Sequence, residues 1–194
     1  MAALLSSVCG DVKKTAEYIS YLEKKNCPLL PPHVNEIELR FAATPSGVRF
    51  GLLGVRNIGE GFISALCEER RRNGPYRGLV DFVERMNDKG ANKSQIAALI
   101  GCGAFDGLGV PRSAMVDGLD GLMQHISDYK RRQADGQMDL FSMLGEKDTA
   151  SEFRFPETAE YSLGEKLALE KELTGMWTVM FFRLCSEAPE RVRK

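Results

Sequence analysis

The sequence contains few of the residue patterns that mark a catalytic centre. It has no Asp-x-Asp pair of the kind that holds two metal ions, no Gly-x-x-x-x-Gly-Lys-Ser/Thr phosphate loop and no recognisable Ser/His/Asp arrangement. Asp117 and Asp120 are three residues apart and fit the surface of a helix. His33 lies in a proline-rich segment and His125 on the flank of a helix, where structural or solvated roles are the simpler interpretation. We therefore expect neither a catalytic site nor a metal site in this chain.

Long hydrophobic runs, clustered cysteines and an excess of positive charge are also missing. No apolar run is long enough to cross a membrane, and the N-terminal sequence lacks the preceding positive charge of a signal peptide. The five cysteines are scattered without a Cys-x-x-Cys pair, which favours free thiols in a reducing cytosol. A formal net charge of −1 excludes a protein that coats nucleic acid with its whole surface, so any basic site must be local. We expect a cytoplasmic protein.

The hydrophobic pattern predicts a mainly helical fold with one small β-hairpin. Residues 38–42 and 48–53 alternate apolar and polar side chains around Thr44-Pro45-Ser46-Gly47, which is typical of a hairpin with a proline-containing turn. Asp11 can cap the first helix, and Ser162 with Glu165 forms a capping box before the last. Helices are predicted at residues 11–25, 61–72, 78–86, 93–100, 112–132 and 163–175.

A polar segment without periodicity follows the longest predicted helix and contains the pentapeptide Gln137-Met138-Asp139-Leu140-Phe141. Exposed Leu and Phe side chains in a linker are typically presented to a pocket of a partner. The pentapeptide resembles the sliding-clamp-binding motif of bacterial replication proteins, although an accidental Leu-Phe that packs back onto the protein remains an alternative. Residues 134–173 contain ten acidic against four basic side chains, so this part of the chain should not bind DNA by charge.

Two glycine-containing turns precede predicted helices and could hold a DNA backbone. The first comprises Arg56, Asn57, Ile58, Gly59, Glu60 and Gly61. Backbone N–H groups at a helix start, supported by the helix dipole, form a phosphate site that needs no side chain. The turn resembles a helix-hairpin-helix motif in which Asn57 replaces the first glycine, and asparagine tolerates the positive φ that the turn requires.

A second, looser version of the motif contains Gly101 and Gly103 and leads to a helix with Arg112 near its start. Two such hairpins in tandem would contact the backbone of one DNA duplex without reading its sequence. The nearest cations in the sequence are Arg56, Lys93 and Arg112. The run Arg70-Arg71-Arg72 could add to this contact, but a charge run at a helix end is more often a solvated face. Plain turn formation is the alternative explanation for the glycines.

The order of these motifs resembles the alpha subunit of bacterial DNA polymerase III, the C-family replicative polymerase. The resemblance covers about residues 1–176, and it is specific because many short matches occur in one collinear order. It departs from the family at Asn57 and after Met176, where Trp177-Thr-Val-Met-Phe-Phe-Arg183 replaces the family's Tyr/Phe-x-Ser-Gly-His-Pro-Leu. The matching stretches are Met1–Leu5, Leu30–Asn35, Arg49–Leu52, Ile58–Gly61, Gly74–Phe82, Asn92–Lys93, Gly103–Asp106, Leu108–Gly109, Gln137–Phe141 and Glu170–Gly175.

The resemblance implies a role in template-directed DNA synthesis, with double-stranded DNA, the sliding clamp and the rest of the polymerase holoenzyme as partners. The family's Mg²⁺ is held by palm aspartates that this sequence does not contain, so we expect no cofactor here and no polymerase activity from the chain alone. The regions expected are the end of the polymerase fingers with the β-hairpin at 1–53, a tandem helix-hairpin-helix DNA-binding domain at 54–132, a linker with the clamp-binding motif at 133–161, and a C-terminal helix with an atypical tail at 162–194.

A free-standing adaptor that binds the clamp and DNA during repair would carry the same motifs. Upstream coding sequence for a palm with paired aspartates would favour the polymerase interpretation over the adaptor.

Overall fold

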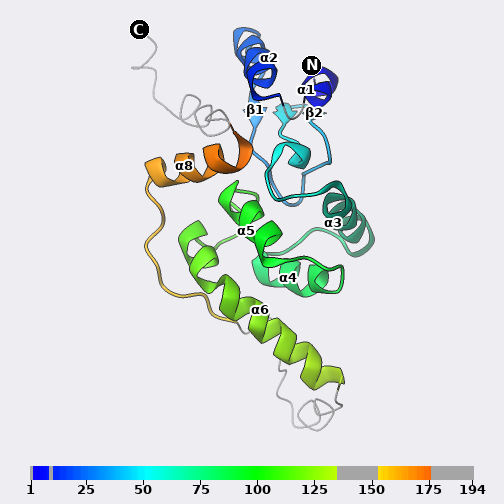
Figure 1. The fold of residues 1–194 in the computed structure, drawn as a ribbon, viewed down its shortest axis with the longest axis vertical. Coiled ribbons are helices and arrows are strands. Elements are labelled where there is room, and N and C mark those ends of the chain that lie inside the picture. The colour runs from blue at the N-terminus through cyan, green and yellow to red at the C-terminus, as the bar shows by residue number, and fades with distance from the viewer. Residues whose placement is uncertain (1, 9–10, 135–152, 176–194) are drawn as a thin grey trace.

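A computed structural model of the chain describes residues 2–8, 11–134 and 153–175. Helices dominate these residues, and a small sheet lies near the N-terminal end of the molecule, as Figure 1 shows. The mainly helical fold with a small β-hairpin is therefore confirmed. The helices are α1 (Ala2–Ser7), α2 (Val12–Lys24), α3 (Glu60–Asn73), α4 (Leu79–Asn87), α5 (Lys93–Gly101), α6 (Arg112–Ala134) and α8 (Leu163–Thr174), with a 3₁₀ turn, η1, at Leu52–Gly54.

The sheet has three very short strands in the order β1-β3-β2. The predicted hairpin forms between β2 (Ala42–Thr44) and β3 (Gly47–Arg49), which pair antiparallel around the proline-containing turn. On its other side β3 pairs in parallel with β1 (Leu29–Leu30), a strand that the sequence pattern did not predict. Two residues between prolines are too few to show alternation, so only the pairing itself identifies this strand.

Helix ends follow the capping chemistry of the sequence closely. The Asp11 carboxylate accepts a hydrogen bond from the N–H of Lys14, and the capping box of Ser162 and Glu165 is formed at the start of α8. Asn92 makes a second capping box with Gln95 at the start of α5, which was not predicted. Each predicted helix is present with ends shifted by at most a few residues, whereas α1 was not predicted.

An aromatic cluster holds the two hairpin regions together. The ring of Phe82 on α4 lies 4.9 Å from that of Tyr76, 5.1 Å from that of Phe105 and 6.5 Å from that of Phe62, all in edge-to-face geometry. Phe62 belongs to α3 and Phe105 to the loop after α5, so one ring contacts both halves of the tandem. Edge-to-face packing of this kind stabilises a core beyond simple burial. The hairpins are thus fixed relative to each other.

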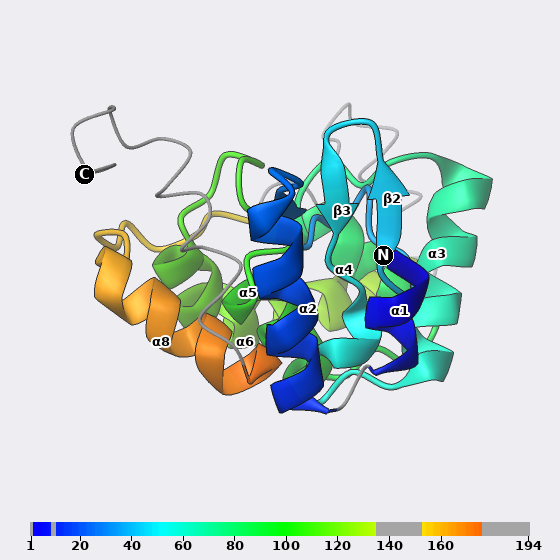
Figure 2. The same ribbon diagram turned by 90° about the horizontal axis from the view of Figure 1, so that it is seen from above.

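The C-terminal part of the described chain packs onto the helical core. Residues 153–161, which we call the strap, run without regular structure along α6, and α8 then lies beside α5 (Figures 1 and 2). Phe153 and Phe155 pack against the core at Gly118 and Gly121 of α6. The strap is irregular, as the linker interpretation predicted, but it is attached to the fold. Residues 135–152 of the predicted linker lie outside the described residues.

Candidate nucleic-acid interface

The first hairpin is a tight turn anchored by two apolar side chains. Val55 and Ile58 are buried, with 3% and 7% of their surface exposed, and they hold the turn against the core. Between them Asn57 has φ +64°, the left-handed conformation predicted for the residue that replaces glycine. Gly59 follows as the N-cap of α3 with φ −92° and ψ 158°, an extended conformation open to other residues. The hairpin therefore depends on Asn57, and less on Gly59, for its backbone shape.

The start of α3 presents unoccupied backbone donors. Within the described residues, the N–H groups of Glu60, Gly61 and Phe62 have no hydrogen-bond acceptor, and Gly59 offers no side chain to cap them. A Cβ atom added at Gly59 or Gly61 would meet nothing within 4 Å, so the surface around these two glycines is open. This arrangement is suited to a phosphate group. The exposed carboxylate of Glu60 lies in the same turn and would weaken such binding.

Arg56 and Lys93 remain available as surface cations. Arg56 has an exposed side chain, and its backbone N–H donates to the carbonyl of Leu173 at 2.7 Å, which ties the hairpin to the end of α8. The Lys93 side chain is 56% exposed and pairs with Asp120 of α6 at 2.7 Å. The run Arg70–Arg72 lies in the last turn of α3, about 15–20 Å along the helix from the hairpin. Arg71 and Arg72 are exposed, as expected for a solvated helix end, whereas Arg70 is largely buried and bonds the carbonyl of Val34 and the carboxylate of Glu38.

The glycines of the second hairpin are required by packing inside the protein. Gly101 and Gly103 are both buried. A Cβ atom at Gly101 would lie 2.5 Å from Cδ1 of Leu173, and one at Gly103 would lie 2.3 Å from Nη2 of Arg112. Gly103 also has φ +82°, which favours glycine on its own. These positions face neighbouring side chains, and we do not retain them as contacts for DNA.

Arg112 is likewise an internal residue, which corrects its expected role as a surface cation. Only 2% of it is exposed, and its guanidinium bonds both carboxylate oxygens of Asp106 at 2.7 Å and Oε1 of Glu170 at 2.7 Å. It also donates to the carbonyl of Gly101 at 3.2 Å. Burial alone would lower the pKa of Arg112, but the two carboxylates raise it above its ordinary value. Arg112 therefore connects the second hairpin to α8.

The start of α6, at the end of the second hairpin, is occupied by a carboxylate of the strap. Glu160 accepts hydrogen bonds from the N–H groups of Arg112 at 3.1 Å and Ser113 at 3.4 Å, and pairs with Lys166 at 3.0 Å. Burial would raise the pKa of Glu160, but Lys166 and the backbone donors hold it below its ordinary value. Nothing in the local sequence around Glu160 indicates this contact, because its partners lie almost fifty residues earlier in the chain.

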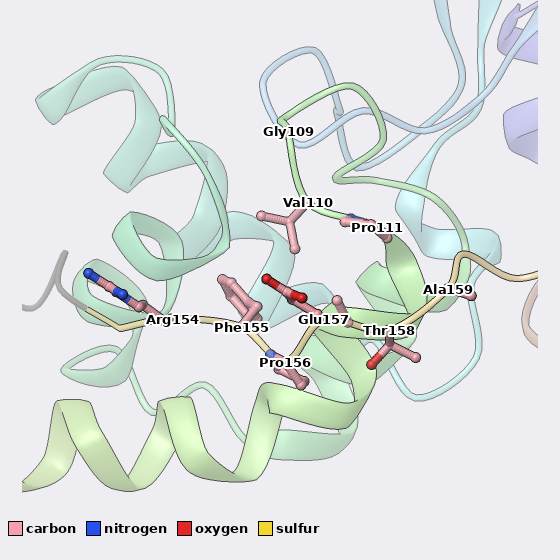
Figure 3. A pocket seen from close by; sticks show the side chains of 10 residues that line it. Gly109, Val110, Pro111, Arg154, Phe155, Pro156, Glu157, Thr158 and Ala159 are labelled. Carbon is pink, nitrogen blue, oxygen red and sulfur yellow. The ribbon is translucent and has the colours of Figure 1, made fainter.

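A shallow pocket of about 710 Å³ lies where the strap crosses the start of α6. It is bounded by Gly109, Val110 and Pro111 on one side and by residues 154–159 on the other, as Figure 3 shows. Among the described residues no group of His, Cys, Asp or Glu side chains is arranged to hold a metal ion. The same residues contain no helix that is both long and apolar enough for a membrane span. The clamp-binding pentapeptide, Gln137–Phe141, lies outside the described residues.

The comparison with known proteins supports the hairpin assignment. Residues 26–115 match the family model of the helix-hairpin-helix motif. The chain is 33% identical to DNA polymerase III subunit alpha of Borreliella burgdorferi over 178 residues, which are 91% of the chain and 16% of the relative. It is 35% identical to the Chlamydia muridarum protein of the same name over 179 residues and 33% identical to that of Mycobacterium tuberculosis over 181.

The chain is similar to one segment of DNA polymerase III subunit alpha. The resemblance stated from the motifs is thereby confirmed over almost the whole chain. The matched segment makes up 14–16% of the alpha subunits of Borreliella burgdorferi, Chlamydia muridarum and Mycobacterium tuberculosis. The helix-hairpin-helix match covers both hairpins except for most of α6, so the motif that suggests DNA binding coincides with the residues described above.

Proposed function

We propose that this chain is a non-catalytic segment of a replicative polymerase alpha subunit that contacts the DNA backbone and binds the sliding clamp. The observation that carries the DNA contact is the start of α3, where three backbone N–H groups have no acceptor among the described residues and Gly59 and Gly61 are open to solvent beside the exposed Arg56. In the complete protein this contact would hold the template-primer duplex during template-directed synthesis. Catalysis with Mg²⁺ would be performed by parts of the polymerase that are not in this chain.

The tandem differs from the expectation that both hairpins contact the DNA backbone. The first hairpin presents its helix start to solvent, whereas the second is filled by Gly101, Gly103, Arg112 and Glu160 contacts within the protein. We therefore assign DNA contact to Arg56, Asn57, Gly59, Glu60 and Gly61 through their backbone or exposed side chains, with Ile58 as the buried anchor. Lys93 is a peripheral cation whose contribution depends on releasing Asp120.

The clamp contact rests on the pentapeptide Gln137–Phe141. Leu140 and Phe141 would fill an apolar pocket of the clamp, and the Gln137 amide would fix the peptide by hydrogen bonds. The acidic composition of residues 134–173 supports a protein partner for this segment, because DNA would be repelled.

DNA binding should be weak, independent of sequence and sensitive to salt. With about three to five neutralised phosphates, log K against log salt should fall with a slope of about −3 to −4.5. Gly59→Val should weaken binding, because the extended backbone of Gly59 accepts valine while its side chain fills the space needed by a phosphate. The measurement is fluorescence anisotropy of a labelled duplex at several salt concentrations.

Gly78→Val is the matched control. Gly78 is the N-cap of α4, and a Cβ atom there also meets nothing within 4 Å. Both variants thus place the same side chain at the start of a helix, but only Gly59 lies in the hairpin. Equal loss of affinity in the two variants, or a salt slope near zero, would remove the basis for the hairpin contact.

A further inference from the structure

Each hairpin leads into a helix, the first into α3 and the second into α6, and the N-termini of these two helices differ. At α3 the donors are open, whereas at α6 the N–H groups of Arg112 and Ser113 are bonded to the carboxylate of Glu160. The carboxylate also pairs with Lys166 at 3.0 Å. Two backbone donors, a helix dipole and an ammonium group therefore converge on one anion. Arg112 N–H and Lys166 contact Oε2 of Glu160, whereas Ser113 N–H contacts Oε1, so the same set of groups suits the two non-bridging oxygens of a phosphodiester.

The occupied site contains a further polar group that the carboxylate does not satisfy. Ser113 is 2% exposed, and its Oγ has no hydrogen-bond partner among the described residues. Buried hydroxyl groups normally have a partner, so this atom marks a donor left over when Glu160 is bound. It belongs to the same residue whose N–H contacts Glu160. The two non-bridging oxygens of a phosphodiester are arranged tetrahedrally rather than in the plane of a carboxylate, so a phosphate bound here could also accept from this hydroxyl.

The strap is held in a way that allows exchange at this position. The side chain of Glu160 is 35% exposed, so a competing anion can reach it from solvent. The ion pairs of Arg112 with Asp106 and Glu170 do not involve the strap and would remain when Glu160 leaves. The hairpin and α8 would therefore keep their positions while the strap moves.

We propose that Glu160 is an intramolecular substitute for a DNA phosphate and that it closes the second hairpin against DNA. This inference rests on the proposed binding of the DNA backbone by the first hairpin. A duplex that displaces Glu160 gains the start of α6 as a second phosphate contact. The strap, which follows the segment with the clamp-binding pentapeptide, therefore limits how strongly the tandem binds DNA.

The test compares Glu160→Ala with Glu157→Ala in the full chain. Both changes remove one negative charge from the strap, but among the described strap residues only Glu160 accepts hydrogen bonds from the backbone N–H groups at the start of α6. We expect Glu160→Ala to bind a DNA duplex more tightly than wild type, with a salt slope steeper by about 0.9. The ratio of its DNA affinity to that of wild type should then be about three- to fourfold larger at 50 mM than at 200 mM salt. Glu157→Ala should show a smaller gain.

Lys166 requires its own control, because it loses its partner when Glu160 is removed. In the Glu160→Ala, Lys166→Ala double variant the steeper slope should persist relative to Lys166→Ala alone. NMR shifts of the Arg112 and Ser113 amides should change when duplex is added to Glu160→Ala. If Glu160→Ala does not fold, Glu160→Gln gives the same comparison with a weaker effect.

The outcomes separate this inference from the proposed function. The role of Glu160 is overturned if Glu160→Ala and Glu157→Ala gain the same DNA affinity. It is also overturned if the gain disappears in the Glu160→Ala, Lys166→Ala double variant. Unchanged DNA binding in Glu160→Ala, while Gly59→Val still weakens binding, overturns it as well. If wild type does not bind DNA, or Gly59→Val has no effect, the proposed function itself fails.

Discussion

Arg112 shows how one buried side chain can determine the role of a whole hairpin. Its guanidinium donates hydrogen bonds to the carboxylate of Asp106, six residues earlier, and to that of Glu170, far along the chain. Glycine at position 103 is required because a Cβ atom there would contact this guanidinium. The turn of the second hairpin therefore resembles a phosphate-binding turn in the sequence but is a structural joint in the fold, and only the backbone donors at the start of α6 keep the geometry of a phosphate site.

Replacing Arg112 should affect stability strongly. Arg112→Leu should lower the free energy of unfolding by about 3–5 kcal/mol, because Asp106 and Glu170 lose a buried cationic partner. Lys93→Leu removes an exposed cation from a surface pair and should cost at most about 1 kcal/mol. Urea unfolding followed by circular dichroism measures both. Similar small losses in the two variants would contradict the structural role of Arg112.

Glu69 should make stability depend on pH in the acid range. It is buried beside Asn73, Arg85 and Lys89, and the hydrogen bond from Asn73, with the contribution of Arg85, lowers its pKa below the ordinary 4.5. A carboxylate with a lowered folded pKa contributes stability that is present above its unfolded pKa and is lost as pH falls through the folded value. That loss should begin near pH 4.5 and continue below it.

Glu69→Gln tests this expectation against Glu68→Gln. The stability difference between wild type and Glu69→Gln should be largest at neutral pH and should shrink below pH 4.5, because protonated Glu69 resembles glutamine. Glu68 is exposed and pairs with Arg72 on the helix surface, so its replacement should change little at any pH. Urea midpoints between pH 7 and 3 provide the measurement. A Glu69→Gln difference that stays constant over this range would refute the assignment.

At the scale of elements, the strap and α6 fit together through two glycines. A Cβ atom at Gly118 would lie 2.9 Å from Cδ1 of Phe155 and 3.0 Å from Cδ of Pro156, too close without movement of the strap. At Gly121 the nearest atoms, from the Phe153 ring, would be 3.5 Å away, which is ordinary contact. Both glycines lie inside a helix, where alanine is preferred by about 1 kcal/mol.

The two positions should therefore respond in opposite directions to the same change. Gly121→Ala should raise the free energy of unfolding by about 0.5–1 kcal/mol, since it gains helix propensity without a clash. Gly118→Ala should lower it, because the ring of Phe155 must leave its place. Thermal unfolding of both variants gives the comparison. Stabilisation of equal size by both substitutions would show that the strap does not pack on Gly118 as described.

Local signals in the sequence predicted the elements well and their packing poorly. Helix starts were predictable where a cap such as Asp11 or Ser162 bonds within its own first turn, and the turn at Asn57 was predictable because few residues adopt positive φ. The strap and the burial of Arg112 had no such signal. Phe153 contacts glycines some thirty residues earlier, and Glu160 contacts a helix start almost fifty residues earlier in the chain. Tertiary contacts between irregular segments leave no periodicity to read.

For the whole molecule, charge separates the two proposed functions. Residues 54–132 contain twelve Lys and Arg against ten Asp and Glu, whereas residues 134–173 are strongly acidic. A weakly positive helical unit with an open helix start suits a DNA backbone, and an acidic segment with an apolar pentapeptide suits a protein. The strap joins these parts, since it follows the pentapeptide in the sequence and its Glu160 contacts the start of α6.

The clamp-binding proposal predicts that the double variant Leu140→Ala, Phe141→Ala loses most of its clamp binding and keeps its DNA binding. A short peptide that becomes ordered on binding should have an affinity of about 1 μM, or about −8 kcal/mol. Truncating each apolar anchor typically costs about 2 kcal/mol, so the double variant should bind the clamp at least about a hundredfold more weakly. DNA affinity and helical content should be unchanged, because the DNA contact is assigned to the first hairpin.

Met143→Ala with Leu144→Ala is the matched control for this prediction. It removes two apolar side chains from the same segment but leaves the pentapeptide intact, so clamp binding should remain near the wild-type value. Titration calorimetry with purified clamp measures the affinities, and circular dichroism measures helical content. Equal weakening by the two double variants would assign binding to the general apolar character of the segment. Loss of helical content in the Leu140 and Phe141 variant would instead show that these side chains belong to the core. Side chains that are exposed for a partner can be replaced by alanine without unfolding the protein, whereas core side chains cannot.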